Sequence, residues 1–195
     1  MDMPFTAILA TTKETLTALE ISITQLRQYP KGDLLCPECK TVMFPRGRKG
    51  YLPHFVHTKK TENCSLAGES QYHLALKLGI YEKCLESYKD AKISVEYSIV
   101  KDNKIIRRAD VMVLFPTGYG IAFEIQLSPI SLEEIKNRTI DYYEQGYDVQ
   151  WIVKKTTNSD IKDWLLDHGS LNVLTTSDFK SAVISSETLE STLPY

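Results

Sequence analysis

The chain has 195 residues, of which 43% are hydrophobic and 25% are charged, and its formal net charge is -2. A chain of this length forms one large domain, or a core of about 120 residues with a small module attached. The composition is that of a globular protein, and the near-neutral charge excludes a uniformly basic nucleic-acid-binding protein, so any such surface must be local.

The sequence contains no membrane-spanning pattern, because no apolar run approaches the roughly 20 residues that a transmembrane helix needs. The segment from Met1 to Ala10 is too short and too mixed for a secretory signal. We therefore expect a cytoplasmic protein without membrane partners. Four cysteines in such a reducing compartment indicate metal binding or packing rather than disulfides.

The first 68 residues predict a small β-rich module. Residues 5–9 and 16–21 have the composition of two short strands around a polar stretch, which indicates a hairpin. Residues 29–68 are rich in Pro, Gly, Cys and His and have few periodic apolar positions. Such a segment cannot build an ordinary core and needs a covalent or metal staple.

The cysteines of this module have the spacing of a metal site. Cys36 and Cys39 form a CxxC pair, and Cys64 follows after two histidines. Three thiolates and one imidazole form a closed tetrahedral set that suits structural zinc. We prefer His57 as the fourth ligand, although the spacing also permits His54. A redox dithiol is the competing interpretation, but the third cysteine and the missing local core favour the metal.

From Glu69 onward the pattern predicts a mixed α/β domain, and we place a domain boundary between residues 68 and 69. The expected order is a helix over 69–85, strands over 93–100, 105–115 and 119–127, a helix over 132–145, a strand over 149–153, a helix over 160–168 and a strand over 171–175. A helix joins the third and fourth strands, so these two should be parallel in a mixed sheet flanked by helices. Ser131 and Glu134 form a capping box, and Gly146 is a natural helix stop.

Two acidic residues fall on neighbouring predicted strands. Asp110 and Glu124 could share one Mg²⁺ or Mn²⁺ ion, with the Ile125 carbonyl as a further ligand. Gln126 shares a strand face with Glu124 and could position a water molecule or the scissile phosphate. Acids at strand ends are commonly solvated, but Glu124 lies in an apolar strand where an unpaired charge is costly. The pattern indicates a metal-dependent phosphodiesterase site.

Other polar residues could complete this site. Glu69, His73 and Lys77 are spaced by four residues along one helix face, so Glu69 could join the metal cluster while His73 and Lys77 contact the substrate. A salt-bridged solvent face explains the two basic residues equally well. Arg108 shares a face with Asp110 and could bind a neighbouring phosphate.

Residues 31–60 carry a local excess of positive charge. Seven basic residues stand against two acidic ones, a net charge of +5, and the basic residues are Lys31, Lys40, Arg46, Arg48, Lys49, Lys59 and Lys60. This surface could hold a nucleic-acid backbone without reading its sequence. A purely solubilising surface is the alternative.

The combined motifs resemble the competence protein CoiA family from about Ala7 to Val153. The residues that carry the resemblance are Leu35-Cys36-Pro37-Glu38-Cys39, Pro53-His54-Phe55-Val56-His57, Cys64, Glu69-x3-His73-x3-Lys77, Arg108-x-Asp110-Val111, Glu124-Ile125-Gln126-x-Ser128, Arg138 and Trp151-Ile152. The resemblance implies a restriction-endonuclease-like PD-(D/E)XK nuclease domain behind a zinc-ribbon-like module. It also implies a role in processing single-stranded DNA during natural transformation.

The resemblance assigns Asp110, Glu124 and Gln126 to the nuclease motif and Glu69 to the helix acid. Ala109 stands where the family usually has proline, and Gln126 stands where nucleases generally have lysine, although glutamine is usual within this family.

These observations support three functional hypotheses. The leading one is a metal-dependent nuclease that cuts DNA rather than RNA. The alternative is a nucleic-acid-binding accessory protein of recombination that keeps the fold without catalysis. The third is a zinc-stabilised interaction domain that binds no nucleic acid. Only the first requires the chemistry of Asp110 and Glu124.

Overall fold

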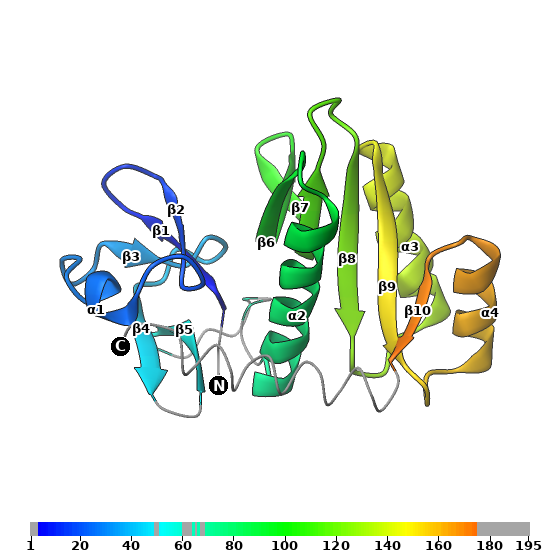
Figure 1. Cartoon of the computed structure of the whole chain (residues 1–195), viewed down its shortest axis with the longest axis horizontal. Helices are drawn as coiled ribbons and strands as arrows, with labels where there is room; N and C mark the ends of the chain where they lie inside the picture. The colour runs from blue at the N-terminus through cyan, green and yellow to red at the C-terminus, as the bar shows by residue number, and fades with distance from the viewer. Residues whose placement is uncertain (1–3, 49–50, 60–63, 65, 67–68, 175–195) are drawn as a thin grey trace. The chain divides into compact units, whose positions relative to one another are not determined.

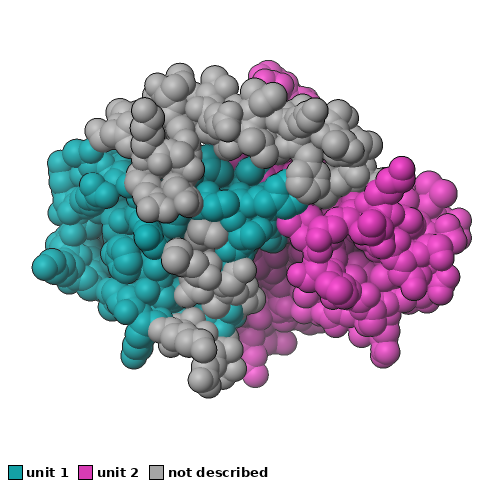
Figure 2. All heavy atoms as spheres, turned by 90° about the horizontal axis from the view of Figure 1, so that it is seen from below, with its two compact units in different colours: residues 1–75, 183–195 teal, residues 76–182 magenta. Residues whose placement is uncertain are grey.

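A computed structural model describes residues 4–48, 51–59, 64, 66 and 69–174 of the chain. The described residues divide into two compact units, one up to Ala75 and one from Leu76 onward, and Figure 2 colours them separately. This division falls inside one continuous helix, α2 (Gln71–Ser87), so the helix is described whole with the second unit. The expected domain boundary between residues 68 and 69 stays a prediction.

The first unit contains two small antiparallel sheets and a short helix (Figure 1). In one sheet β1 (Thr6–Leu9) lies between β2 (Thr15–Thr17) and β3 (Leu34–Leu35). In the other, β4 (Met43–Arg48) pairs with β5 (Tyr51–His57). The helix α1 (Ile23–Leu26) begins at Ser22. The predicted N-terminal hairpin is confirmed as β1 and β2.

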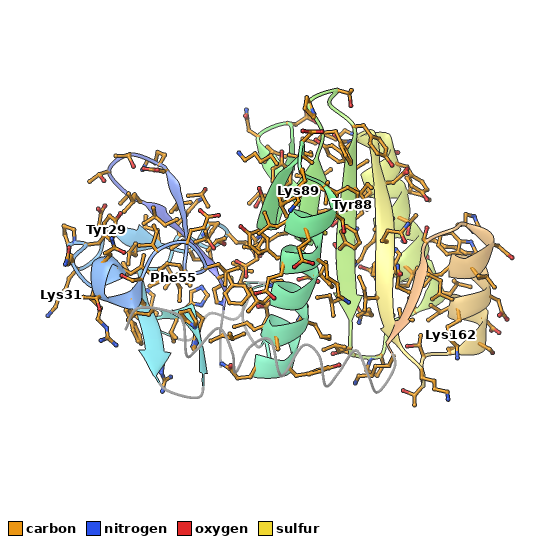
Figure 3. All side chains as sticks on the ribbon, viewed as in Figure 1. Tyr29, Lys31, Phe55, Tyr88, Lys89 and Lys162 are labelled. Carbon is orange, nitrogen blue, oxygen red and sulfur yellow. The ribbon has the colours of Figure 1, made fainter. Side chains whose placement is uncertain are left out.

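Sequence patterns did not indicate β4 and β5, because Pro45, Gly47 and Pro53 count against strand formation. Proline is tolerated here because each strand of a two-stranded sheet has one edge that needs no ladder hydrogen bonds. The core of this unit is small. It includes the fully buried Phe55, labelled in Figure 3, and also Cys36 and Cys64.

The second unit is built on a five-stranded mixed sheet, which confirms the predicted fold class. Its spatial order is β10-β9-β8-β7-β6. The strands are β6 (Lys92–Lys101), β7 (Lys104–Leu114), β8 (Gly120–Gln126), β9 (Tyr147–Lys154) and β10 (Leu171–Leu174). Strands β6 to β8 form an antiparallel meander, and β9 is parallel to both β8 and β10. The parallel pair expected around the crossover helix is therefore confirmed.

Helices cover both faces of this sheet. Figure 1 shows α2 on one face and α3 (Leu132–Glu144) on the other, and α4 (Ser159–Asp167) shares a core with α3. Tyr142 and Trp151 are the largest fully buried side chains of that core. Helix α3 begins where Ser131 Oγ accepts a hydrogen bond from the Glu134 backbone N–H at 3.1 Å. Among the described helices, none is both long enough and apolar enough to cross a membrane.

Candidate functional site

The first unit brings three cysteine sulfurs and one imidazole together. Ligand atoms of Cys36, Cys39, His57 and Cys64 all lie within 4.8 Å of one another. Cys36 Sγ is 3.6 Å from Cys64 Sγ, and His57 Nε2 is 3.4 Å from Cys39 Sγ. Ligands of a tetrahedral zinc ion lie about 3.5–3.8 Å apart when the bonds have their usual lengths. The four side chains could therefore hold zinc.

A tight turn places the CxxC pair. The Cys36 N–H donates to the Thr41 carbonyl at 2.9 Å, and the Lys40 N–H donates to the Cys36 carbonyl at 3.1 Å. Lys40 has a φ of 59°, which turns the chain back sharply after Cys39. This turn sets the two sulfurs beside His57, the last residue of β5.

The thiols of this cluster respond differently to their surroundings. Burial raises the pKa of the Cys36 and Cys64 thiols, because the interior disfavours a thiolate. Burial also raises the pKa of Cys39, but hydrogen bonds with Thr41, Cys36 and Cys64 together outweigh burial and lower this pKa to about 7. A bound cation would stabilise all three thiolates and offset the cost of burying them.

His54 does not belong to this group. Its Nδ1 lies 2.7 Å from the Leu52 carbonyl oxygen, and the side chain is buried. Burial first, and then the nearby Arg46 charge, lower the pKa of His54. Of the two histidines that the spacing permits, the structure brings His57 to the cysteines.

A second group of possible metal ligands consists of Glu69, His73 and Asp110. One ligand atom from each lies within 4.8 Å of the others. Ser70 Oγ accepts the His73 N–H at 3.1 Å, so Ser70 caps the start of α2 directly after Glu69. Glu69 Oε1 is 3.9 Å from His73 Nδ1. Two carboxylates and an imidazole form a donor set that could bind a divalent ion.

Both carboxylate oxygens of Asp110 have polar neighbours. Oδ2 accepts the backbone N–H of Ile125 at 2.9 Å, and Oδ1 lies 3.5 Å from Lys77 Nζ. Lys77 has no exposed surface, and its Nζ also lies 3.0 Å from Glu96 Oε1. The solvent-face interpretation is therefore wrong for Lys77, which lies in a buried network of charges.

Glu124 has a different set of partners. Its carboxylate accepts a hydrogen bond from the Tyr142 hydroxyl, and its Oε2 lies 3.9 Å from Arg138 Nη1. Both partners come from α3. The structure does not bring Glu124 into the ligand group of Asp110. This holds although Val111 of β7 pairs with Phe123 of β8, Asp110 directly precedes Val111, and Glu124 directly follows Phe123.

The remaining predicted site residues have local partners. Gln126 Nε2 donates to the Ser128 carbonyl at 2.8 Å, and Arg108 Nε donates to Ser98 Oγ at 3.4 Å. Of the basic residues in segment 31–60, Lys49 and Lys60 lie outside the described residues. The catalytic and substrate-binding roles of these side chains stay predictions.

Sequence reasoning missed two contributors to this region. Tyr142 lies on the buried face of α3, and such a face gives no sign in the sequence of the partner of a hydroxyl group. Glu96 lies in the strand predicted over residues 93–100, where an acid between hydrophobic neighbours is typical of a solvent-facing position. Its burial comes from tertiary packing, and the sequence pattern around it gives no signal of that burial.

Comparison with known families gives a match over residues 69–189 to the family described as competence protein CoiA, nuclease-like domain. None of the curated proteins matches the chain.

Proposed function

The chain belongs to the family of the competence protein CoiA nuclease-like domain, and from this premise we propose that it is a metal-dependent nuclease that hydrolyses phosphodiester bonds of DNA. We further propose single-stranded DNA as its substrate, in line with a competence role. The observation that carries the proposal is the gathering of Glu69, His73 and Asp110 within ligand distance of one another.

A Mg²⁺ or Mn²⁺ ion held by these three residues would polarise the phosphate and acidify a water molecule. Within the protein, the Ile125 N–H fixes Asp110 Oδ2 and so sets the direction of the other carboxylate oxygen. The imidazole of His73 favours Mn²⁺ over Mg²⁺, because Mg²⁺ prefers ligands made only of oxygen.

Glu124 and Gln126 are proposed to position the attacking water. They lie two residues apart on β8, so their side chains emerge on one face of the strand. Tyr142 orients the Glu124 carboxylate by hydrogen bonding. Arg108, two residues before Asp110 on β7, is proposed to bind a phosphate next to the cleaved bond.

The deciding experiment is a cleavage assay on labelled single-stranded DNA, double-stranded DNA and RNA, with Mg²⁺ and Mn²⁺ titrated separately. Cleavage should require the ion and fall at least about 100-fold in Asp110→Ala and Glu124→Ala. Glu144→Gln is the matched control, because Glu144 is an exposed acid paired with Lys101. DNA binding by the wild type without ion-dependent cleavage would support the non-catalytic accessory protein instead.

A further inference from the structure

Glu96 has an unusual backbone for a residue in the middle of a strand. Its φ is 52°, in the left-handed region that L side chains other than Asn and Asp rarely adopt. It is 5% exposed, so its carboxylate is buried as well. A conformation of this kind persists where the surrounding structure demands it, and such residues cluster at functional sites.

The carboxylate of Glu96 meets the buried ammonium of Lys77. Oε1 and Nζ are 3.0 Å apart, and the two side chains are 1% and 0% exposed. The same Nζ lies 3.5 Å from Asp110 Oδ1. Three different elements, α2, β6 and β7, thus set one ammonium between two carboxylates, with the shorter contact to Glu96.

This arrangement bears on any cation that Asp110 binds. A buried ammonium beside a carboxylate competes with a metal ion for the negative charge of that carboxylate. The charge of Glu96 balances the charge of Lys77, so Asp110 keeps its own negative charge available. Without Glu96, the ammonium would have Asp110 as its counter-ion and would oppose the metal directly.

We propose that Glu96 is a positioning residue of the nuclease-like site, which anchors Lys77 and thereby sets the affinity of Asp110 for a divalent ion. This inference rests on the proposed function, in which Asp110 is a metal ligand. It gives the two members of the ion pair opposite effects. Removing the charge of Glu96 weakens metal binding, and removing the charge of Lys77 strengthens it.

The test is calorimetric titration of Mn²⁺ into the zinc-loaded full chain without nucleic acid. Glu96→Gln keeps the size of the side chain and one acceptor, and it should raise the Kd for Mn²⁺ about tenfold. Lys77→Met should lower this Kd about tenfold, because the buried ammonium then no longer competes with the metal ion for the charge of Asp110. The double variant should return to within about threefold of the wild type, since the opposing charges are removed together.

An exposed ion pair supplies the matched control. Lys101 Nζ and Glu144 Oε2 lie 3.3 Å apart at the surface of the second unit, and Lys101→Met and Glu144→Gln should leave the Kd unchanged. Thermal unfolding of each variant identifies any that does not fold. If Glu96→Gln does not fold, Lys77→Met decides the question. If Lys77 had a purely structural role, its replacement would leave the Kd for Mn²⁺ unchanged or raise it.

The outcomes separate this inference from the proposed function. A wild-type chain that binds no Mn²⁺ beyond the zinc site overturns both. The role of Glu96 alone is overturned if the wild-type chain binds Mn²⁺ and cuts DNA, but the Kd values of Glu96→Gln and Lys77→Met are unchanged or shift in the same direction. Opposite shifts with recovery in the double variant support it.

Discussion

The hydroxyl group of Tyr142 donates a hydrogen bond to the carboxylate of Glu124, which joins helix α3 to strand β8. Tyr142 has no exposed surface, and Glu124 is 7% exposed. Burial first, and then the charge of Glu124, raise the pKa of Tyr142, so its hydroxyl stays protonated and remains a donor. The acid of β8 is therefore held by the helix that follows this strand in the sequence.

Tyr142→Phe should lower the free energy of unfolding by about 1–3 kcal/mol, because the buried carboxylate loses a hydrogen-bond donor. Denaturant unfolding at pH 7 to 8 measures the change. The matched control is Tyr143→Phe on the same helix, where the side chain is 43% exposed and the expected loss is below about 0.5 kcal/mol. Equal stabilities for both variants would show that the contact with Glu124 contributes nothing.

Sequence patterns predicted the second unit well for a physical reason. Strand β9 buries an apolar run and helix α3 buries one face, so the buried positions recur in the sequence with the period of each element. Short elements of the first unit, such as α1 and β3, bury too few residues to produce a period. Their positions depend on the capping box of Ser22 and on pairing with β1.

The candidate sites show the same division. The spacing of the cysteines predicts the grouping of the three cysteines with a histidine, because these residues lie close in the sequence. The link between Lys77, Glu96 and Asp110 is made by three separate elements, and the left-handed backbone of Glu96 leaves no trace in the hydrophobic pattern. Partners of buried charges are a property of tertiary packing, which a single sequence does not encode locally.

The cluster of Cys36, Cys39, His57 and Cys64 leads to a prediction about the first unit. The purified chain should contain one Zn²⁺, and Cys36→Ser should lose it together with the folded first unit, because the small core depends on the metal. Elemental analysis and circular dichroism before and after chelation measure both effects. Cys84→Ser is the control. Cys84 is a buried thiol of α2 whose pKa is raised to about 11 by burial, and it lies outside the cluster.

The two histidines of β5 offer a sharper comparison. His57→Ala should weaken zinc binding at least about tenfold, since a ligand is lost. His54→Ala should leave the zinc affinity close to that of the wild type, although it removes buried volume. Competition with a chromogenic chelator gives both affinities. A larger loss of zinc affinity in His54→Ala than in His57→Ala would show that His54, and not His57, is the ligand.

His54 also predicts a pH dependence. Its pKa in the folded protein is lowered, mainly by burial, from the ordinary value of 6.5. The unfolded chain therefore takes up a proton near pH 6.5 while the folded chain does not, so this contribution to stability is present above pH 6.5 and is lost as the pH falls below it. An NMR titration of the His54 ring should show its inflection below pH 6.5. An inflection at or above that value would contradict the prediction.

The basic segment of the first unit should govern nucleic-acid binding separately from catalysis. Lys31, labelled in Figure 3, and Lys59 are exposed, and the double variant with glutamine at both positions should bind single-stranded DNA more weakly. The slope of log K against log salt is negative, and each lost phosphate contact makes it shallower by about 0.7. The slope of the double variant should therefore be shallower by about 1.4. Fluorescence anisotropy across a salt series measures the slope.

The matched control replaces two exposed lysines of the second unit, Lys89 and Lys155, with glutamine. This control has the same change in net charge but should keep the wild-type slope, which separates a local surface from the general effect of charge. Cleavage at saturating DNA should be equal in both double variants, because neither touches Asp110 or its neighbours. Equal slopes in the two double variants would show that the basic segment only increases solubility. The second unit would then have to supply the phosphate contacts.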